Sequence, residues 1–474
     1  MIVPLLAVAA SVAVWCGVYR RLVGHPLDPM ALTLYYVALL LLWRPLTLAA
    51  GLDTPFPTEV FAGRDVGGLI VGGQAVVALW LLAMFAGARW LTPLVRPTML
   101  LFPRRRTTLA PRVVLTLAVL LSVAALAATA VLWARYGGPT GLIQAAKVDR
   151  SVTESRALRS LPLMGALLSV AAFYSVRPRA YGQRLLALGL VVLNGVLNFT
   201  WGARDVLVVS LVALVAGALL FSRRMRERHG DLSGLSWLRD PLWRRRLVLV
   251  AVLALGLAFA LRLARDTALI GGAAPSIEGQ GPLRAFSVAT NTTLYDTLLL
   301  ILDDWPDEQP FHGGRDFVDG AVTSVPSVIA GEQEPFVSPA VQVAQTYVDR
   351  NNGFPATAVG DWYLNLGLVG ILLGGLLSGV LARAAQVAFA RFREDPLVWG
   401  FSLVFMLRIF PGGLWATSLP RWVAIGLPLV LLALALDLVS RRRSGAGTGL
   451  SPPHEDRRRS GGLPAGSPPV PTPP

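Results

Sequence analysis

Long apolar runs are the feature that most constrains how this chain can fold. Hydrophobic residues make up 54% of its 474 residues, and charged residues only 15%. The apolar residues gather in runs of about 15 to 23 residues, the length that one helical crossing of a bilayer requires when its flanks are included. We count about eleven such runs, at Ile2–Val18, Met30–Ala50, Val66–Ala88, Val113–Ala134, Leu161–Val176, Leu185–Phe199, Val206–Phe221, Leu247–Ala264, Trp362–Leu381, Leu397–Ile409 and Trp422–Val439. The sequence therefore predicts an all-α, polytopic membrane protein with about eleven transmembrane helices.

Arginine-rich loops predict how these helices are oriented. Cytoplasmic loops are enriched in arginine and lysine because the translocation of positive charge is disfavoured. When the loops are assigned alternately to two sides, one side receives "YRR", "RPTMLLFPRRR", "RPRAYGQR", "SRRMRERHG…RDPLWRRR", "RFRED" and "SRRR". The other side receives the longer and more acidic connections. We therefore expect the amino terminus outside and the carboxyl terminus in the cytoplasm, an arrangement that requires an odd number of spans.

One predicted external connection is far longer than the others. It runs from Arg265 to Gly360, about 95 residues, and loops of that length usually have a function or secondary structure of their own. We divide the chain into a membrane domain, residues 1–440, which includes the large external loop at 265–360, and a tail at 441–474. The tail is rich in Gly, Pro, Ser and Arg, so we expect it to be disordered in the cytoplasm.

Within this loop, "GPLRAFSVATNTTLYDTLLLILDDW" has apolar positions compatible with a helix. Two interpretations are open. The segment is either a helix that lies at the membrane interface or a short helix packed on the transmembrane bundle. In the first case, the face immersed in lipid consists of Leu283, Phe286, Leu294, Leu298 and Ile301.

The cysteine, histidine and charge content excludes several classes of function. Cys16 is the single cysteine, so the chain has neither an intrachain disulfide nor a cysteine metal cluster. The four histidines show no metal-ligand spacing, and nothing in the sequence calls for a metal or another cofactor. The net charge of +15 resides in short loops between apolar runs rather than on one soluble face, so it does not indicate nucleic-acid binding.

Arginines on the predicted outer side are unexpected under the topology rule. A guanidinium group stays charged and pairs bidentately with phosphate oxygens, so arginines that converge above the membrane are suited to hold a pyrophosphate-linked lipid. Structural salt bridges are the alternative for each one. The residues concerned are Arg135, Arg150, Arg156, Arg159, Arg204, Arg265, Arg315 and Arg350, with Arg44, Arg408 and Arg421 near span ends.

The stretch "VGDWYLNLGLVGILLGGLLSGVLAR" places Asp361 at the outer mouth of a glycine-spaced span. Its glycines include two small-xxx-small spacings, which favour close helix packing. Trp362 and Tyr363 lie where an interfacial aromatic belt is expected. Asp361 itself has two interpretations, either a catalytic base or the N-cap of the span.

These residues belong to a segment that resembles the oligosaccharide repeat-unit polymerases, the Wzy-type O-antigen polymerases. The resemblance rests on "GRDFVDGAVTSVPSVI" followed, after a variable stretch, by "AVGDWYLNLGLVG" at the opening of a glycine-rich span. "WGARDVLVV" is similar to the family's short glycine-arginine element before a span. One departure is clear, since Ser327 and "EQEP" stand where the family often has basic residues, which suggests a different glycan.

The resemblance implies an enzyme that joins repeat units at the outer face of the bacterial cytoplasmic membrane. Its substrate would be a polyprenyl-diphosphate-linked oligosaccharide, and its partners would be membrane lipid, a chain-length regulator and a repeat-unit flippase. External arginines would offset the charge of the departing diphosphate, and a carboxylate would take the proton of the acceptor hydroxyl. The candidates are Arg204, Arg265, Arg315, Arg350, Arg408 and Arg421 for the diphosphate, and Asp361, Asp316 and Asp319 for the base.

Two alternative functions remain, a ligase within the same fold group and a transporter from a different class. An O-antigen ligase transfers a finished glycan and typically relies on a histidine in the large external loop, where His312 is the only histidine of this chain. His312 lies well before the glycine-rich span, which favours the polymerase. A flippase or transporter of lipid-linked sugars would show charges or broken helices at mid-membrane depth, whereas the charges here cluster outside.

Overall fold

The computed structural model describes the chain in blocks, together with scattered residues elsewhere. The blocks are residues 2–91, 110–148, 161–177, 179–201, 292–322, 339–348 and 356–391. Within them, every regular element is a helix. The predicted runs at 206–221, 247–264, 397–409 and 422–439 lie wholly or largely outside the described residues.

The first block contains the helices that begin the chain. They are α1 (Ile2–Leu22), α2 (Pro29–Val37), the π-helix η1 (Ala38–Trp43), α3 (Arg44–Ala49) and α4 (Val66–Trp90). The elements α2, η1 and α3 follow one another end to end as one apolar segment. Asp28 caps this segment, since its Oδ1 accepts a hydrogen bond from Ala31 N at 2.6 Å.

A second group of helices comes from the middle of the chain. It consists of α6 (Pro111–Tyr136), α7 (Pro139–Val148), α8 (Leu161–Ser175) and α9 (Tyr181–Thr200). Gly137 ends α6 with a φ of 74°, a left-handed conformation that a residue without a side chain adopts most easily. The helices α6, α8 and α9 pack on one another, and α7 contacts α6 and α9.

The described part of the predicted external loop contains three short helices, and a long helix follows it. These elements are α14 (Leu294–Asp304), α15 (Arg315–Val322), α17 (Pro339–Val348) and α18 (Ala358–Arg391). The helix α18 packs mainly on α4, and α14 contacts both α4 and α18.

Six helices among the described residues are long and apolar enough to cross a membrane. They are Ile2–Leu22, Pro29–Ala49, Val66–Trp90, Pro111–Tyr136, Tyr181–Thr200 and Ala358–Ala390. A shorter apolar helix, Leu161–Ser175, matches a seventh predicted run. The structure thus confirms the all-helical, membrane-protein class. The total of about eleven spans stays a prediction, because four of the predicted runs are not described.

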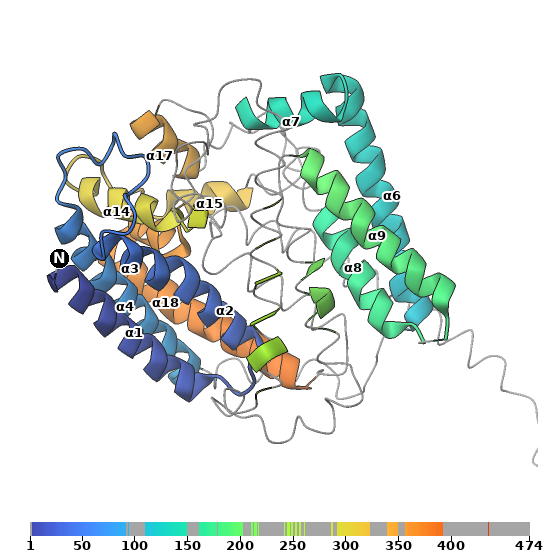
Figure 1. Cartoon of the computed structure of the whole chain (residues 1–474), viewed down its shortest axis with the longest axis horizontal. Helices are drawn as coiled ribbons and strands as arrows, with labels where there is room; N and C mark the ends of the chain where they lie inside the picture. The colour runs from blue at the N-terminus through green and yellow to red at the C-terminus, as the bar shows by residue number, and fades with distance from the viewer. Residues whose placement is uncertain are drawn as a thin grey trace, which may run out of the picture.

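The short helices of the predicted outer connections lie at one end of the long helices. In Figure 1, α7, α14, α15 and α17 all lie toward the top of the view, whereas the turn between α8 and α9 lies at the lower right. The arginine pattern had assigned the connections that contain these four helices to the outside and the α8–α9 turn to the cytoplasm. This arrangement is consistent with the predicted alternation of sides, although the orientation of the termini remains a prediction.

Helix α14 resolves the choice that the sequence left open between an interfacial and a packed helix. Leu294, Leu298 and Ile301 of the proposed lipid face are buried, and so are Leu299 and Leu300 on the other side of the helix. A helix lying in the membrane interface would keep one apolar face exposed to lipid. The described part of this segment is therefore packed on the bundle.

The glycine spacing of α18 serves close packing, as the sequence predicted. A Cβ atom added to Gly379 would lie 2.0 Å from the Met84 carbonyl oxygen of α4. From the other side, a Cβ atom on Gly87 would lie 2.1 Å from the Leu376 carbonyl oxygen of α18. Only glycine allows two backbones to approach this closely, which strengthens their van der Waals contact in lipid.

A buried polar network joins the first and third spans to α14. Gln74 Nε2 donates to the Leu41 carbonyl at 3.1 Å and to the Tyr295 hydroxyl at 3.0 Å. The Leu41 carbonyl needs an outside partner because Pro45, four residues later, has no N–H to donate. The Ser11 hydroxyl of α1 in turn donates to the backbone carbonyl of Gln74 at 3.1 Å. Each contact satisfies a polar group that lipid cannot solvate.

Arg44 is a structural link rather than a free external cation. Its side chain is 0% exposed, and its Nε and Nη2 donate to the two carboxylate oxygens of Asp296 at 3.0 and 2.7 Å. It also pairs with Asp53. Burial raises the pKa of Asp296 to about 6, although the hydrogen bonds from Arg44 act in the opposite direction. The bidentate pair fastens α14 to the end of the second span.

Candidate functional site

Helix α18 is broken at Gly367, in the stretch that opens the glycine-rich span. Gly367 has φ 60° and ψ −142°, a conformation outside the helical region. Beyond the break the chain folds back on itself, because a Cβ atom on Gly374 would lie 2.4 Å from Cγ of Trp362. A straight helix of these 34 residues would be about 51 Å long, far beyond a hydrocarbon core of about 30 Å. Trp362 therefore belongs to the folded-back part, not to the start of the span.

The turn "FHGGRD" docks against this break. Gly313 and Gly314 have φ angles of 62° and 83°, which let the chain reverse within two residues. His312 N then donates to the Leu364 carbonyl at 3.1 Å, a group that a continuous helix would use internally. The Phe311 ring fills the space beside Gly367, where a Cβ atom would lie 2.9 Å from its Cζ. The two segments that carry the family resemblance are therefore in direct contact.

Aromatic contacts hold the docked turn in place. The Phe317 and Trp362 rings have centroids 4.6 Å apart, and those of Phe311 and Tyr363 are 5.6 Å apart in an edge-to-face arrangement. The Tyr363 hydroxyl also donates to the Trp305 carbonyl at 3.1 Å. Trp362 is only 9% exposed. Its predicted place in an interfacial aromatic belt is therefore wrong, because its ring packs inside the protein.

Two side-chain pairs lie on the turn and on α15. His312 Nδ1 and Asp316 Oδ2 are 2.6 Å apart, and Asp316 is buried. Arg315 Nε donates to Asp319 at 3.2 Å, with the Arg315 side chain 79% exposed. Both pairs have the i,i+4 spacing that places side chains on one face of a helix turn. Three of the predicted site residues, Arg315, Asp316 and Asp319, are thus assembled within a single short segment.

Asp361 lies deeper than the sequence predicted. It is 0% exposed and occupies the fourth position of α18. The cap is Thr357, whose Oγ1 accepts from Gly360 N at 3.2 Å and whose carbonyl accepts from Asp361 N at 2.9 Å. The interpretation of Asp361 as the N-cap is therefore wrong. A threonine three residues before Gly360 has the spacing of an N-cap, so the sequence contained a signal for Thr357.

A further cluster near the site was missed by sequence reasoning. Arg64, in the loop before α4, pairs with Asp303 and, at 2.6 Å, with Asp304 of α14. Tyr347 of α17 donates to Asp304 and to the Leu300 carbonyl, the latter at 3.3 Å. Burial and the hydrogen bond to Asp304 raise the pKa of Tyr347, so its hydroxyl keeps its proton. The partners of Arg64 are more than two hundred positions away, so no local pattern could indicate them.

The other predicted diphosphate ligands are not part of the described structure. Arg204, Arg265, Arg350, Arg408 and Arg421 all lie outside the described residues. Their convergence with Arg315 therefore stays a prediction.

Comparison with known proteins gives this site no precedent. No family model matches the chain, and no curated protein or solved structure is significantly similar to it.

The docked turn offers two kinds of chemistry. The Asp316 carboxylate at Nδ1 of His312 favours the tautomer with its proton on Nδ1, which leaves Nε2 free to accept a proton. Beside this base, Arg315 uses only Nε for Asp319, so in the described structure both of its Nη groups are available to an anion. The arrangement combines a proton acceptor with an exposed cation on one rigid turn.

Proposed function

We propose that this protein is a membrane glycan polymerase of surface polysaccharide biosynthesis. It joins polyprenyl-diphosphate-linked oligosaccharide repeat units at the outer face of the bacterial cytoplasmic membrane. A chain-length regulator and a repeat-unit flippase are its expected partners, and its substrate reaches it from the lipid bilayer.

The observation that supports the proposal is the contact between the two polymerase-like segments. Phe317 of "GRDFVDG" packs on Trp362 of "GDWYLNLG", with ring centroids 4.6 Å apart, and His312 N donates to the Leu364 carbonyl, so the two segments are in contact although 44 residues separate Asp316 from Asp361. Their meeting point also holds the exposed Arg315 and the His312–Asp316 pair.

The proposed reaction uses these groups in one displacement. The hydroxyl oxygen of the acceptor sugar forms a bond to the anomeric carbon of the donor. The bond from that carbon to the diphosphate oxygen breaks, and the polyprenyl diphosphate leaves with the electron pair. Arg315 offsets the negative charge that grows on the leaving group. The hydroxyl proton passes to Nε2 of His312, and Asp316 stabilises the resulting imidazolium.

The test is polymer formation in a strain that lacks the chromosomal gene. We expect Arg315→Ala, and Arg204→Ala outside the described residues, to abolish polymer at normal protein abundance. Arg315→Lys should restore less than half of it, because lysine lacks the planar fork that grips two phosphate oxygens. Arg20→Ala, an exposed arginine at the opposite end of α1, is the control and should leave polymer unchanged. Full activity of Arg315→Ala would refute the proposed role of this residue.

One observation favours a second candidate, the ligase type. A histidine in the external loop is the residue on which the ligase type relies, and His312 lies there with a buried carboxylate partner that orients its ring. The two functions differ in what accumulates when the gene is deleted. Loss of a polymerase leaves single lipid-linked repeat units at the outer face, whereas loss of a ligase leaves full-length chains on the lipid carrier. Single units retained on the cytoplasmic face would instead indicate a transporter.

A further inference from the structure

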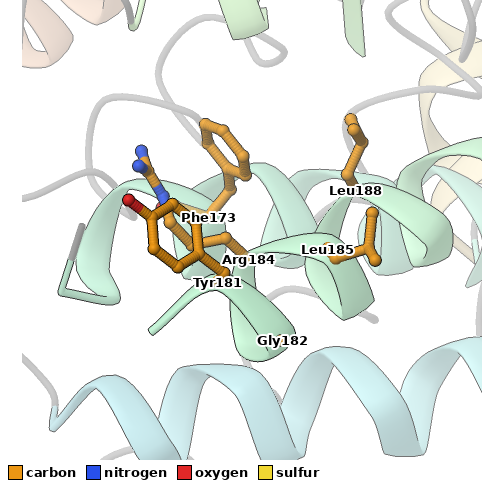
Figure 2. Close-up of a pocket in the computed structure, with 6 residues that line it drawn as sticks. All are labelled: Phe173, Tyr181, Gly182, Arg184, Leu185 and Leu188. Atoms are coloured by element: carbon orange, nitrogen blue, oxygen red, sulfur yellow. The ribbon is translucent and has the colours of Figure 1, made fainter. Parts of the chain in front are cut away.

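A shallow groove lies at the turn between α8 and α9, far along the chain from the candidate site. It has a volume of about 440 Å³, and Figure 2 shows the side chains that line it. They are Phe173, Tyr181, Gly182, Arg184, Leu185 and Leu188. This α8–α9 groove is at the end of the hairpin that the arginine pattern assigns to the cytoplasmic side.

Arg184 is the one charged residue of the groove, and its position is fixed. Its Nε donates to the Phe173 carbonyl at 3.3 Å, and its guanidinium carbon lies 4.3 Å from the centroid of the Phe173 ring. The ring and the carbonyl hold the guanidinium without neutralising it. No residue in the described part of the chain accepts a hydrogen bond from either Nη. Because the accessible lining of the groove itself is almost entirely apolar, the guanidinium lies at its rim, where both Nη groups can bind an anion.

The rest of the groove is apolar and faces outward. Tyr181 and Leu185 are 77% and 71% exposed, and Leu188 is also exposed. Their spacing of four and three residues places all three on one face of α9, in a line that leads from the arginine along the helix. A tyrosine at the end of such a line is typical of the membrane–water interface.

The charge of the hairpin indicates which kind of ligand can bind along Tyr181, Leu185 and Leu188. Residues 161–200, the whole hairpin, contain three arginines, at 177, 179 and 184, and no aspartate or glutamate. An acidic peptide would match the arginines but not the exposed leucines, and a neutral lipid would match only the leucines. An anionic phospholipid matches both the arginine and the leucines, since it carries a phosphate and an acyl chain in one molecule.

We propose that the α8–α9 groove binds an anionic phospholipid of the cytoplasmic leaflet. Its phosphate accepts hydrogen bonds from the Nη groups of Arg184, and its acyl chain lies along Leu185 and Leu188. The Tyr181 ring lies at the level of the glycerol backbone. This site is independent of the proposed glycan chemistry, because it lies at the opposite end of the predicted spans.

The experiment uses the full-length protein in mixed micelles that contain equal amounts of phosphatidylglycerol and phosphatidylcholine. Native mass spectrometry counts the lipids that stay bound. We expect the unmodified protein to retain phosphatidylglycerol selectively and Arg184→Gln to bind it about tenfold more weakly, because a charged hydrogen-bond donor is lost. Arg89→Gln removes an exposed arginine from the end of α4 and is the matched control. It should retain the lipid.

One further variant and one competition experiment test the proposal. Leu185→Asn, at an exposed position with little packing to lose, should weaken phosphatidylglycerol binding even if Arg184→Gln fails to fold. Glycerophosphoglycerol, the same headgroup without acyl chains, should not compete. Equal retention by the Arg184→Gln and Arg89→Gln proteins would overturn the proposal. Full competition by the free headgroup would also overturn it, since the groove would then be an anion site and not a lipid site.

Discussion

Three aspartates of the predicted site have similar sequence surroundings but different environments in the structure. Asp316 is buried against His312, Asp319 is partly exposed against Arg315, and Asp361 is fully buried inside the first turn of α18. Each lies beside a glycine or an aromatic residue, so the sequence could not rank them. Burial by partners elsewhere in the chain separates them. Only the Asp316 pair combines a shielded carboxylate with a group that a substrate can reach.

This ranking predicts opposite outcomes for two substitutions. His312→Gln should lower the rate of polymer formation by about a hundredfold or more, because glutamine cannot accept a proton at neutral pH. Asp361→Asn should retain polymer, because a side chain without exposed surface cannot meet an acceptor hydroxyl. The measurement is the rate at which lipid-linked repeat units are consumed in isolated membranes.

Thr357→Ala provides the structural comparison for Asp361. Loss of the cap should cost about 1 kcal/mol of stability without changing the rate per folded molecule. If Asp361→Asn instead stopped polymer formation while Thr357→Ala did not, Asp361 would be the catalytic base. The structure around this buried side chain would then have to open during the reaction.

At the scale of elements, α18 shows where a hydropathy pattern is insufficient. The apolar run and its packing glycines were readable, since Gly375 and Gly379 follow a known spacing and do contact α4. The break at Gly367 was not readable, because nothing within the run distinguishes this glycine from its neighbours. What distinguishes it is the Phe311 ring, which comes from a turn 56 positions earlier.

The break predicts that Gly367 is far less replaceable than a glycine on an open helix face. Gly367→Ala forces a side chain into a backbone conformation that costs about 1–3 kcal/mol and into the space of Phe311. Gly72→Ala in α4 is the control, since a Cβ atom there meets nothing within 4 Å. Heating each purified protein in detergent and measuring the fraction that remains monodisperse should show a lower midpoint for Gly367→Ala only. A shared midpoint would mean that the break is dispensable.

At the scale of the whole molecule, the class of fold was predictable and the connections between distant parts were not. Apolar runs indicated every described long helix, because lipid imposes the same length on each span. The contacts of Arg44 with Asp296 and of Arg64 with Asp304 had no counterpart in the sequence pattern. Such pairs depend on which loop covers which helix end, and periodicity contains no information about that.

Single cysteines test the predicted sidedness. In a Cys16→Ser background, a cysteine at Gln309 should react with an impermeant reagent on intact spheroplasts, because Gln309 is exposed among the short outer helices. A cysteine at Ser233, outside the described residues, should react only after the membrane is opened. Labelling of both positions from outside would contradict the predicted number of spans.

The pairing of Arg44 with Asp296 also has a consequence for biosynthesis. The two residues are 252 positions apart, so the ribosome delivers the arginine long before its partner. At roughly 5–20 residues per second, the interval is on the order of ten to fifty seconds. During that time the end of the second span holds a cation whose main acidic partner has not yet been made. Until α14 is made, Asp53 is the acidic partner of Arg44 in the described structure, and a chain truncated before α14 should be degraded faster than the full chain.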